Sequence, residues 1–518
     1  MLLGHVAFGL FGLGVLLMIA WSFSRNRGRI DWTLVGTGVA LQIAFALFVL
    51  GGPSLLKQLA QVAPEFRMLL PRLLKWGALI AVLLWVVWYV LNRGRQAPAT
   101  ETREEQPTVT AGPDAAPGLK KAASILTWVI AIVGLPFLGR TFEILAHVFV
   151  RLLDVVKAGS GFVFGGLVTN MDTFGFIFAF QVLPTIIFFA ALMAVLYHLG
   201  VMQFLVRLMA IGITKVMRVS GAETTSVCAS VFIGQTEAPL TVRPYIPSMT
   251  NSELITMMIG GMAHIAGGVM ASYVQMLGGA DPVAQAEFAK HFLTASIMAA
   301  PATLVIAKML VPEVGEPLTR GTVKMEVEKT SSNVIDAAAS GAADGLRLAL
   351  NIGAMLLAFI ALIELLNIAI GGLADFSGFT AWLNSGREVP IAVNLGTILG
   401  AILAPIAWVI GIPWDDAIIA GGLIGQKLVI NEFVAYLALG ATSVGDGIGQ
   451  ISEQTKLVLT YALCGFANFS SIAIQIGGIG GLAPDRRGDL ARFGLLAVLG
   501  GTLATFMTAT IAGVLSRM

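Results

Sequence analysis

Residues 229–242 read ASVFIGQTEAPLTV, and residues 427–439 read KLVINEFVAYLAL. Each stretch is a largely apolar run interrupted by polar residues that include a glutamate, Glu237 in the first and Glu432 in the second. Backbone that breaks its helix within a bilayer must line a cavity or lie buried in protein, because lipid offers no hydrogen bonds. We therefore predict that the regions around 220–250 and 415–440 are not ordinary membrane spans.

The composition of the chain is that of a polytopic membrane protein. Of its 518 residues, 57% are hydrophobic and 12% are charged, and the mean hydropathy is +0.85. A soluble domain has about twice that charged fraction. The net charge of +2 provides no field that would attract nucleic acid. Cys228 and Cys464 are too few for a disulfide framework, and we expect both to be buried thiols.

Several apolar runs reach the length of about 20 residues that a membrane helix needs. The N-terminal run lacks a basic region before it and a cleavage site after it, so we expect a retained span. Basic clusters at 25–29 and 93–121 predict cytoplasmic loops and an N-terminus outside. The linker 92–121 is polar and rich in Pro, Thr and Glu, which predicts disorder. The predicted spans are 3–24, 33–51, 72–91, 122–138, 177–198, 293–311, 346–372, 390–411 and 490–515.

The two halves of the sequence resemble one another. Residues 252–276 and 452–478 could cross the bilayer, but each has a Gly-rich break midway. An Ile-Gly-Gln sequence precedes each of them, and each opens with Ser-Glu. Paired interrupted segments in two halves indicate a transporter's substrate site. The sequence thus predicts an all-α membrane protein with inverted repeats, whose halves are joined by a polar linker at 313–335.

Glu237 and Glu432 are the strongest candidates for chemistry. An ionised carboxylate at mid-membrane costs at least about 2.5–3.5 kcal/mol, so such residues are rare and mostly functional. The alternative is a structural carboxylate satisfied by a helix end or by Arg243. Carboxylate, amide and hydroxyl groups at helix breaks suit a ligand with a diol and an amide-like edge. The sequence contains no zinc spacing, P-loop or nucleophile elbow, so we expect no enzyme and no cofactor.

Long segments resemble the concentrative nucleoside transporter family, from about residue 160 to the C-terminus. The matching segments are FAFQVLPTIIFFAALMAVLYHLGVMQ (178–203), GQTEAPLTVRPYIPSMTNSEL (234–254), VIDAAASGAADGLRLALNIGAMLLAFIALI (334–363), INEFVAYLAL (430–439) and YALCGFANFSSIAIQIGGIGGLAPDRRGDLARFG (461–494).

This resemblance implies a homotrimer that works by alternating access, with two re-entrant helical hairpins at 220–250 and 415–440 and two broken transmembrane helices. It implies a nucleoside as substrate and a bacterial inner (plasma) membrane as location. The site residues carried over from the family are Gln235, Thr236 and Glu237 for the nucleobase, Glu432, Asn468 and Ser471 for the ribose, and Phe466 beside them.

Two departures from the family leave the coupling cation open. Sodium-using members have Asn where this chain has Ser230, and Ser or Thr where it has His264. The carbonyls of Ile233 and Ile265 remain as oxygen ligands. Sodium coupling, proton coupling through an imidazole and facilitation without an ion are therefore all retained. His264 could instead point aside and bond a carbonyl freed by the break.

The N-terminal third departs from compact bacterial members of the family. Spans 72–91 and 122–138 form an extra pair, followed by an interfacial helix at 140–158. The expected organisation is 1–91 N-terminal spans, 92–121 linker, 122–158 extra span and interfacial helix, 159–312 first transport half, 313–335 linker and 336–518 second transport half. An intramembrane enzyme and a nucleoside sensor are the remaining alternatives.

Overall fold

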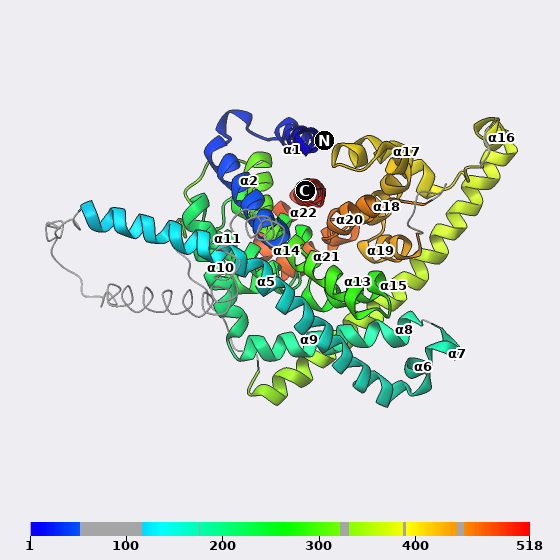
Figure 1. Ribbon diagram of the computed structural model, residues 1–518, viewed down its shortest axis with the longest axis horizontal. Coiled ribbons are helices and arrows are strands. Elements are labelled where there is room, and N and C mark those ends of the chain that lie inside the picture. Colours follow the sequence, from blue (N-terminus) through cyan, green and yellow to red (C-terminus); the bar gives the residue numbers. More distant parts are fainter. Residues whose placement is uncertain are drawn as a thin grey trace, which may run out of the picture. The chain divides into compact units, whose positions relative to one another are not determined.

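The computed structural model describes residues 2–51, 117–175, 177–321, 331–386, 390–442 and 450–517. The predicted span 72–91 and most of the linker 92–121 lie outside these ranges. The described elements are all helical (Figure 1). They form two compact units, Met1–Ala46 with Leu145–Met518, and Leu47–Ile144. All predicted site residues belong to the first unit.

Seven helices of the described residues are long and apolar enough to cross a bilayer. They match the predicted spans 3–24, 33–51, 177–198, 293–311, 346–372 and 490–515 and the broken segment 252–276. The predicted span 390–411 is shorter than expected, because Asn394 caps the start of its helix and the helix ends at Val409. The seven are Gly4–Ser22, Trp32–Leu50, Phe178–His198, Asn251–Gly278, Pro282–Leu310, Val334–Phe376 and Pro484–Leu515.

One continuous helix, α5 (Pro117–Phe164), contains both the predicted span 122–138 and the predicted interfacial helix 140–158. It also includes the last residues of the predicted linker. The remaining helices before the first repeat are α1 (Leu2–Ser22), α2 (Trp32–Ala46), α6 (Gly166–Thr169), α7 (Met171–Phe174) and α8 (Phe178–Gln181).

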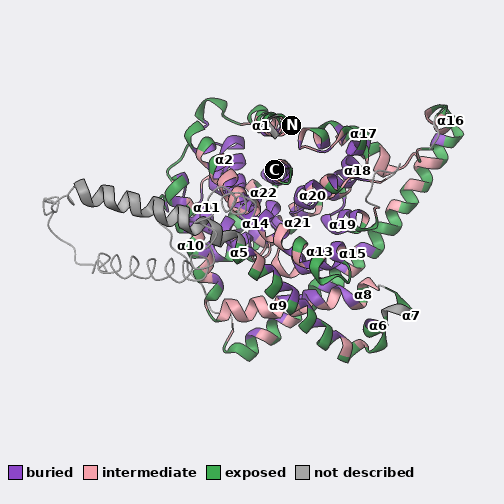
Figure 2. Cartoon of the chain, viewed as in Figure 1, coloured by how far each residue is buried: buried purple, intermediate pink, exposed green. Residues whose placement is uncertain are grey.

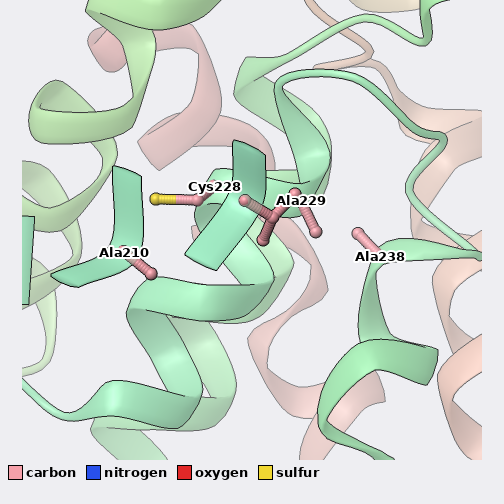
Figure 3. Close-up of a cluster of buried hydrophobic side chains, with 5 residues drawn as sticks. Ala210, Cys228, Ala229 and Ala238 are labelled. Atoms are coloured by element: carbon pink, nitrogen blue, oxygen red, sulfur yellow. The ribbon is translucent and has the colours of Figure 1, made fainter. Parts of the chain in front are cut away.

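The region 220–250 is a pair of short helical arms joined by a turn. The first arm is α11 (Gly221–Ser230), which Ser220 and Glu223 start with a capping box. The second is the 3-10 helix η3 (Ala238–Ser248). Small buried side chains of both arms, among them Cys228, Ala229 and Ala238, pack with Ala210 of α10 (Val201–Met217), as Figure 3 shows. Small residues allow such close helix packing.

The region 415–440 is a second helical pair. A short 3-10 turn, η4 (Trp414–Asp416), leads into α18 (Ala417–Val429), and α19 (Glu432–Ala441) returns after a break of two residues. Asn431 caps α19 through its Oδ1, which accepts from the Val434 amide at 3.0 Å. The re-entrance of both pairs into the bilayer remains a prediction.

Both predicted broken helices are broken. The first consists of α12 (Asn251–Ala263) and α13 (Gly267–Gly278), and the second of α20 (Glu453–Ala462) and α21 (Phe469–Leu482). The two breaks meet, because the Phe466 amide donates to the His264 carbonyl at 3.3 Å. Gly465 has φ +135°, and a Cβ there would lie 2.8 Å from the Met262 carbonyl oxygen. Only glycine fits at this crossing.

The order of elements repeats in the two halves. The first half has α9 (Leu183–His198), α10, α11, η3, α12, α13 and α14 (Pro282–Leu310); the second has α15 (Val334–Phe376), α17 (Leu395–Val409), α18, α19, α20, α21 and α22 (Arg487–Leu515). Outside this order lie α1, α2, α5 to α8, η4, α16 (Phe379–Asn384) and the short elements η1 (Arg27–Arg29), η2 (Leu47–Gly51) and η5 (Pro484–Arg486).

The core lies around α22. This helix packs against α12, α14, α20 and α21 (Figure 1). Helices α12, α14 and α22 are mostly buried, whereas α15 is mostly exposed along its length (Figure 2). The broken helices, and with them the predicted site, are therefore held by the most buried part of the chain.

Candidate functional site

The Glu432 carboxylate is buried between three elements. It is the first residue of α19, and the N-terminus of a helix favours a negative charge. The Tyr273 hydroxyl of α13 donates to its Oε1 at 2.9 Å. Asn468 Nδ2, at the start of α21, donates to its Oε2 at 3.0 Å. The partners are neutral donors, which leaves lone pairs of both oxygens available for further donors.

Asn468 connects this carboxylate to Ser471. As the N-cap of α21, its Oδ1 accepts from the Ser471 amide at 2.9 Å. The Ser471 hydroxyl then accepts a hydrogen bond from Gln235 Nε2 at 3.1 Å. Both residues are buried. The tips of the two helical pairs, 197 residues apart at Gln235 and Glu432, are thereby joined through the N-terminus of α21.

Gln235 is held at its other end by Gln475, which the sequence analysis did not identify. Gln475 Nε2 donates to Gln235 Oε1 at 3.2 Å and to the Met258 carbonyl at 2.9 Å. Gly261 makes room for both amides, since a Cβ there would lie 2.7 Å from Gln475 Nε2. The signal for Gln475 was its spacing: it stands four residues after Ser471, on the same face of a helix.

Thr236 and Glu237 lie at the same tip but outside this chain of hydrogen bonds. The Thr236 hydroxyl donates to Glu237 Oε1 at 2.9 Å. Glu237 is exposed, unlike Glu432. Phe466 is half-buried at the second break, where its carbonyl accepts from the Asn468 amide at 2.9 Å. The predicted base-facing residues are therefore adjacent in the structure but differ in exposure.

The four predicted ion-binding residues lie near the first break. The buried Ser230 hydroxyl donates to the Ser226 carbonyl of its own helix at 3.0 Å. His264 is buried, and its Nδ1 lies 2.7 Å from the Gly260 carbonyl oxygen. The imidazole thus turns back onto its own helix, which is the alternative arrangement considered from the sequence. Its Nε2 is buried without a hydrogen-bond partner among the described residues.

The Ile233 and Ile265 positions flank the contact between the first pair and the break. The Gly267 amide, which opens α13, donates to the Phe232 carbonyl at 3.0 Å, so the turn after α11 lies against the start of α13. Ile265 is 1% exposed. Within the described ranges, no group of three or more His, Cys, Asp or Glu residues could hold a metal. Any cation bound here would depend on backbone carbonyls and hydroxyls.

Two further residues were not foreseen. Tyr273 follows the first break by nine positions and reaches Glu432 in the other half. Lys427 is fully buried on α18, and its Nζ donates to the Ala462 carbonyl at 2.9 Å. The buried thiols Cys228 and Cys464 are free, as predicted. The site as a whole offers paired hydrogen-bond donors and acceptors around one buried carboxylate.

Three sequence-family models match the chain. They are described as "Na+ dependent nucleoside transporter N-terminus" (residues 11–71), "Nucleoside recognition" (179–280) and "Na+ dependent nucleoside transporter C-terminus" (291–513). Together they include every predicted site residue, with Glu432, Asn468 and Ser471 in the C-terminal one.

Curated relatives and solved structures agree with these models. The chain is 46% identical to the uncharacterized transporter YutK of Bacillus subtilis (70% of this chain, 83% of the relative) and 42% identical to the nucleoside permease NupC of Helicobacter pylori (68% and 80%). It is 36% identical to human sodium/nucleoside cotransporter 1 (94% and 77%). The structure of CNTnw in an inward-facing substrate-bound state matches with a TM-score of 0.71 and 36% identity, over 99% of this chain and 98% of that one. The chain belongs to the concentrative nucleoside transporter family.

Proposed function

We propose that this protein carries nucleosides inward across the membrane by cation-coupled symport. The observation that supports this most directly is the line of hydrogen bonds from Glu432 through Asn468 and Ser471 to Gln235. It places a carboxylate and an amide at opposite ends of one row of polar groups, between two helical pairs. A nucleoside has a diol at one end and a base edge at the other.

The ribose hydroxyls would donate to Glu432, which retains unused lone pairs beside Tyr273 and Asn468. The nucleobase would exchange hydrogen bonds with Gln235, whose amide has both donor and acceptor atoms. Thr236 and Glu237 complete the base side, and Phe466 lies beside the ribose partner Asn468. Affinity would come from replacing protein hydrogen bonds with ligand ones in a buried site, where unpaired polar groups are costly.

Transport would follow alternating access. CNTnw is described in inward-facing, outward-facing and intermediate states. In this chain the moving part would contain both helical pairs and both broken helices, within the halves 159–312 and 336–518, with 313–335 between them. The exposed apolar length of α15 needs lipid or a partner subunit against it, and the homotrimer that we propose would provide both. Bacterial relatives support an inner-membrane location.

Sodium is the coupling cation that we propose. The matching families and a human relative are described as sodium-dependent or sodium cotransporters. The His264 ring bonds to Gly260 of its own helix, which leaves the Ile233 and Ile265 carbonyls and the Ser230 hydroxyl as oxygen donors. Proton coupling is the second candidate, because an imidazole at the break is a side chain that can carry a proton near neutral pH.

Uptake of labelled uridine and adenosine into proteoliposomes tests this proposal. Uptake is measured under a sodium gradient and, separately, under a pH gradient. The sodium gradient should drive accumulation of the nucleoside above its equilibrium level. Absence of uptake of either nucleoside under any gradient would refute nucleoside transport. Equal uptake with and without each gradient would indicate facilitation. Product formation from a nucleoside-linked lipid would support the enzyme alternative. Binding of nucleoside without uptake would indicate a sensor.

A further inference from the structure

Lys427 is a buried lysine to which the proposed transport cycle assigns no role. Its side chain is 0% exposed near the end of α18. Its Nζ donates to the Ala462 carbonyl at 2.9 Å and to the Thr505 hydroxyl at 3.3 Å. No carboxylate of the described residues forms an ion pair with it. A buried ammonium is unfavourable unless negative potential surrounds it.

The end of the broken helix α20 supplies part of that potential. Ala462 is its last residue, so the carbonyls there have lost their partners in the next turn. The C-terminus of a helix carries partial negative charge, which favours a cation. The hydrogen bond from the Lys427 ammonium to the Ala462 carbonyl therefore gives the free carbonyl at the helix end a donor, and it gives the buried ammonium an acceptor.

Glu432 is a second source of negative potential. It stands five residues after Lys427, across the tip of the second helical pair, and it bonds Asn468 on one side of the second break while Lys427 bonds Ala462 on the other. The other titratable groups around the two are Cys464, Tyr436 and Tyr273, which are ordinarily neutral at neutral pH. Lys427 and Glu432 are thus the two opposite charges of this part of the site.

We propose that Lys427 is a built-in cation of the nucleoside site: a positioning residue whose ammonium docks the second helical pair on the end of α20 and keeps the Glu432 carboxylate charged for the ribose hydroxyls. This inference rests on the proposed function. At the break of the first half, the group that bonds a freed carbonyl is an imidazole, because His264 Nδ1 lies 2.7 Å from the Gly260 carbonyl oxygen.

Substitution of Lys427 by Met tests the charge while keeping the length of the side chain. Uridine binding to the purified protein is measured by calorimetry, and trimer size and melting temperature report folding. Lys427→Met should weaken uridine binding by about tenfold or more, as expected for loss of a charge-assisted interaction. Lys456→Met is the matched control: this lysine is partly exposed on α20, and its variant should bind uridine as the unchanged protein does.

Comparing ligands with and without a ribose hydroxyl distinguishes an effect through Glu432 from a purely structural effect of Lys427. If Lys427 acts through Glu432, Lys427→Met should weaken uridine binding more than binding of 3′-deoxyuridine, which lacks one of the two hydroxyls. Equal losses for both ligands, or uridine binding within about twofold of the unchanged protein, would overturn the proposal. Failure of the unchanged protein to bind uridine would instead refute the proposed function.

Chemical rescue covers the case in which Lys427→Met does not fold. Lys427→Ala leaves space for a small cation, and propylammonium chloride should restore uridine binding or the melting temperature. Sodium chloride at the same ionic strength should not. Absence of recovery with propylammonium, or equal recovery with both salts, would overturn the proposal.

Discussion

Gln235 Nε2 donates to the Ser471 hydroxyl at 3.1 Å, although the two residues are separated by 236 positions in the sequence. This bond joins the tip of the first helical pair to the first turn of α21. Glu432 reaches the same turn through Asn468. The N-terminus of α21 therefore positions both sides of the proposed nucleoside site. A substitution at the tip of one helical pair should alter the position of the side chains at the tip of the other.

Glu432→Gln should weaken uridine binding by about 10- to 100-fold, because hydrogen bonds to a charged group contribute about 1.5–3 kcal/mol each. Uptake should fall below detection while the size of the protein assembly stays unchanged. Uptake in proteoliposomes and size-exclusion chromatography measure the two effects. Glu287→Gln, an exposed carboxylate near the start of α14, is the control. Retained transport by Glu432→Gln would show that this residue is not the ribose ligand.

Gln475→Leu should weaken uridine binding by about tenfold, because it leaves Gln235 Oε1 and the Met258 carbonyl without their shared donor. The loss should be the same for uridine and 3′-deoxyuridine, since Gln475 lies on the base side. Calorimetry with both ligands checks this. A loss confined to uridine would place Gln475 on the ribose side instead.

His264→Gln should retain sodium-driven uridine uptake. A glutamine amide can donate to the Gly260 carbonyl as the imidazole does, but it cannot titrate near neutral pH. Uptake is compared under a sodium gradient and under a pH gradient in the same proteoliposomes. If the unchanged protein is driven by the pH gradient and His264→Gln is not, proton coupling through His264 replaces the sodium proposal.

Lys308→Met should destabilise the protein by about 3–5 kcal/mol, because it removes the cation from a buried ion pair. Lys308 Nζ lies 2.8 Å from Glu223 Oε2 and also donates to the Ser252 hydroxyl at 2.9 Å. This pair fastens the first arm to α12 and α14. The melting temperature should fall sharply. The double variant with Glu223→Gln should lose less than the sum of the single losses, whereas additive losses would show that the two residues do not interact.

The sequence alone determined the membrane class and the two interrupted regions. It also predicted four site residues that the structure brings into contact, Gln235, Glu432, Asn468 and Ser471. These follow from local physics: a run of apolar residues predicts a span, and a glutamate within such a run is too costly to be incidental. The helix breaks after Ala263 and Ala462 were placed correctly for the same reason, because glycine and polar residues interrupt the pattern. The family resemblance added Asn468 and Ser471, which periodicity could not single out.

Only the tertiary structure decided which polar groups meet. Tyr273, Gln475 and Lys427 look like ordinary helix residues in the sequence, and each became significant through a partner in a distant segment. The orientation of His264 was likewise open, because a ring at a helix break can face either its own helix or the neighbouring one. Local spacing determines helices and their ends; the choice among hydrogen-bond partners depends on long-range packing, in which each buried polar group must find a donor or acceptor from another part of the chain.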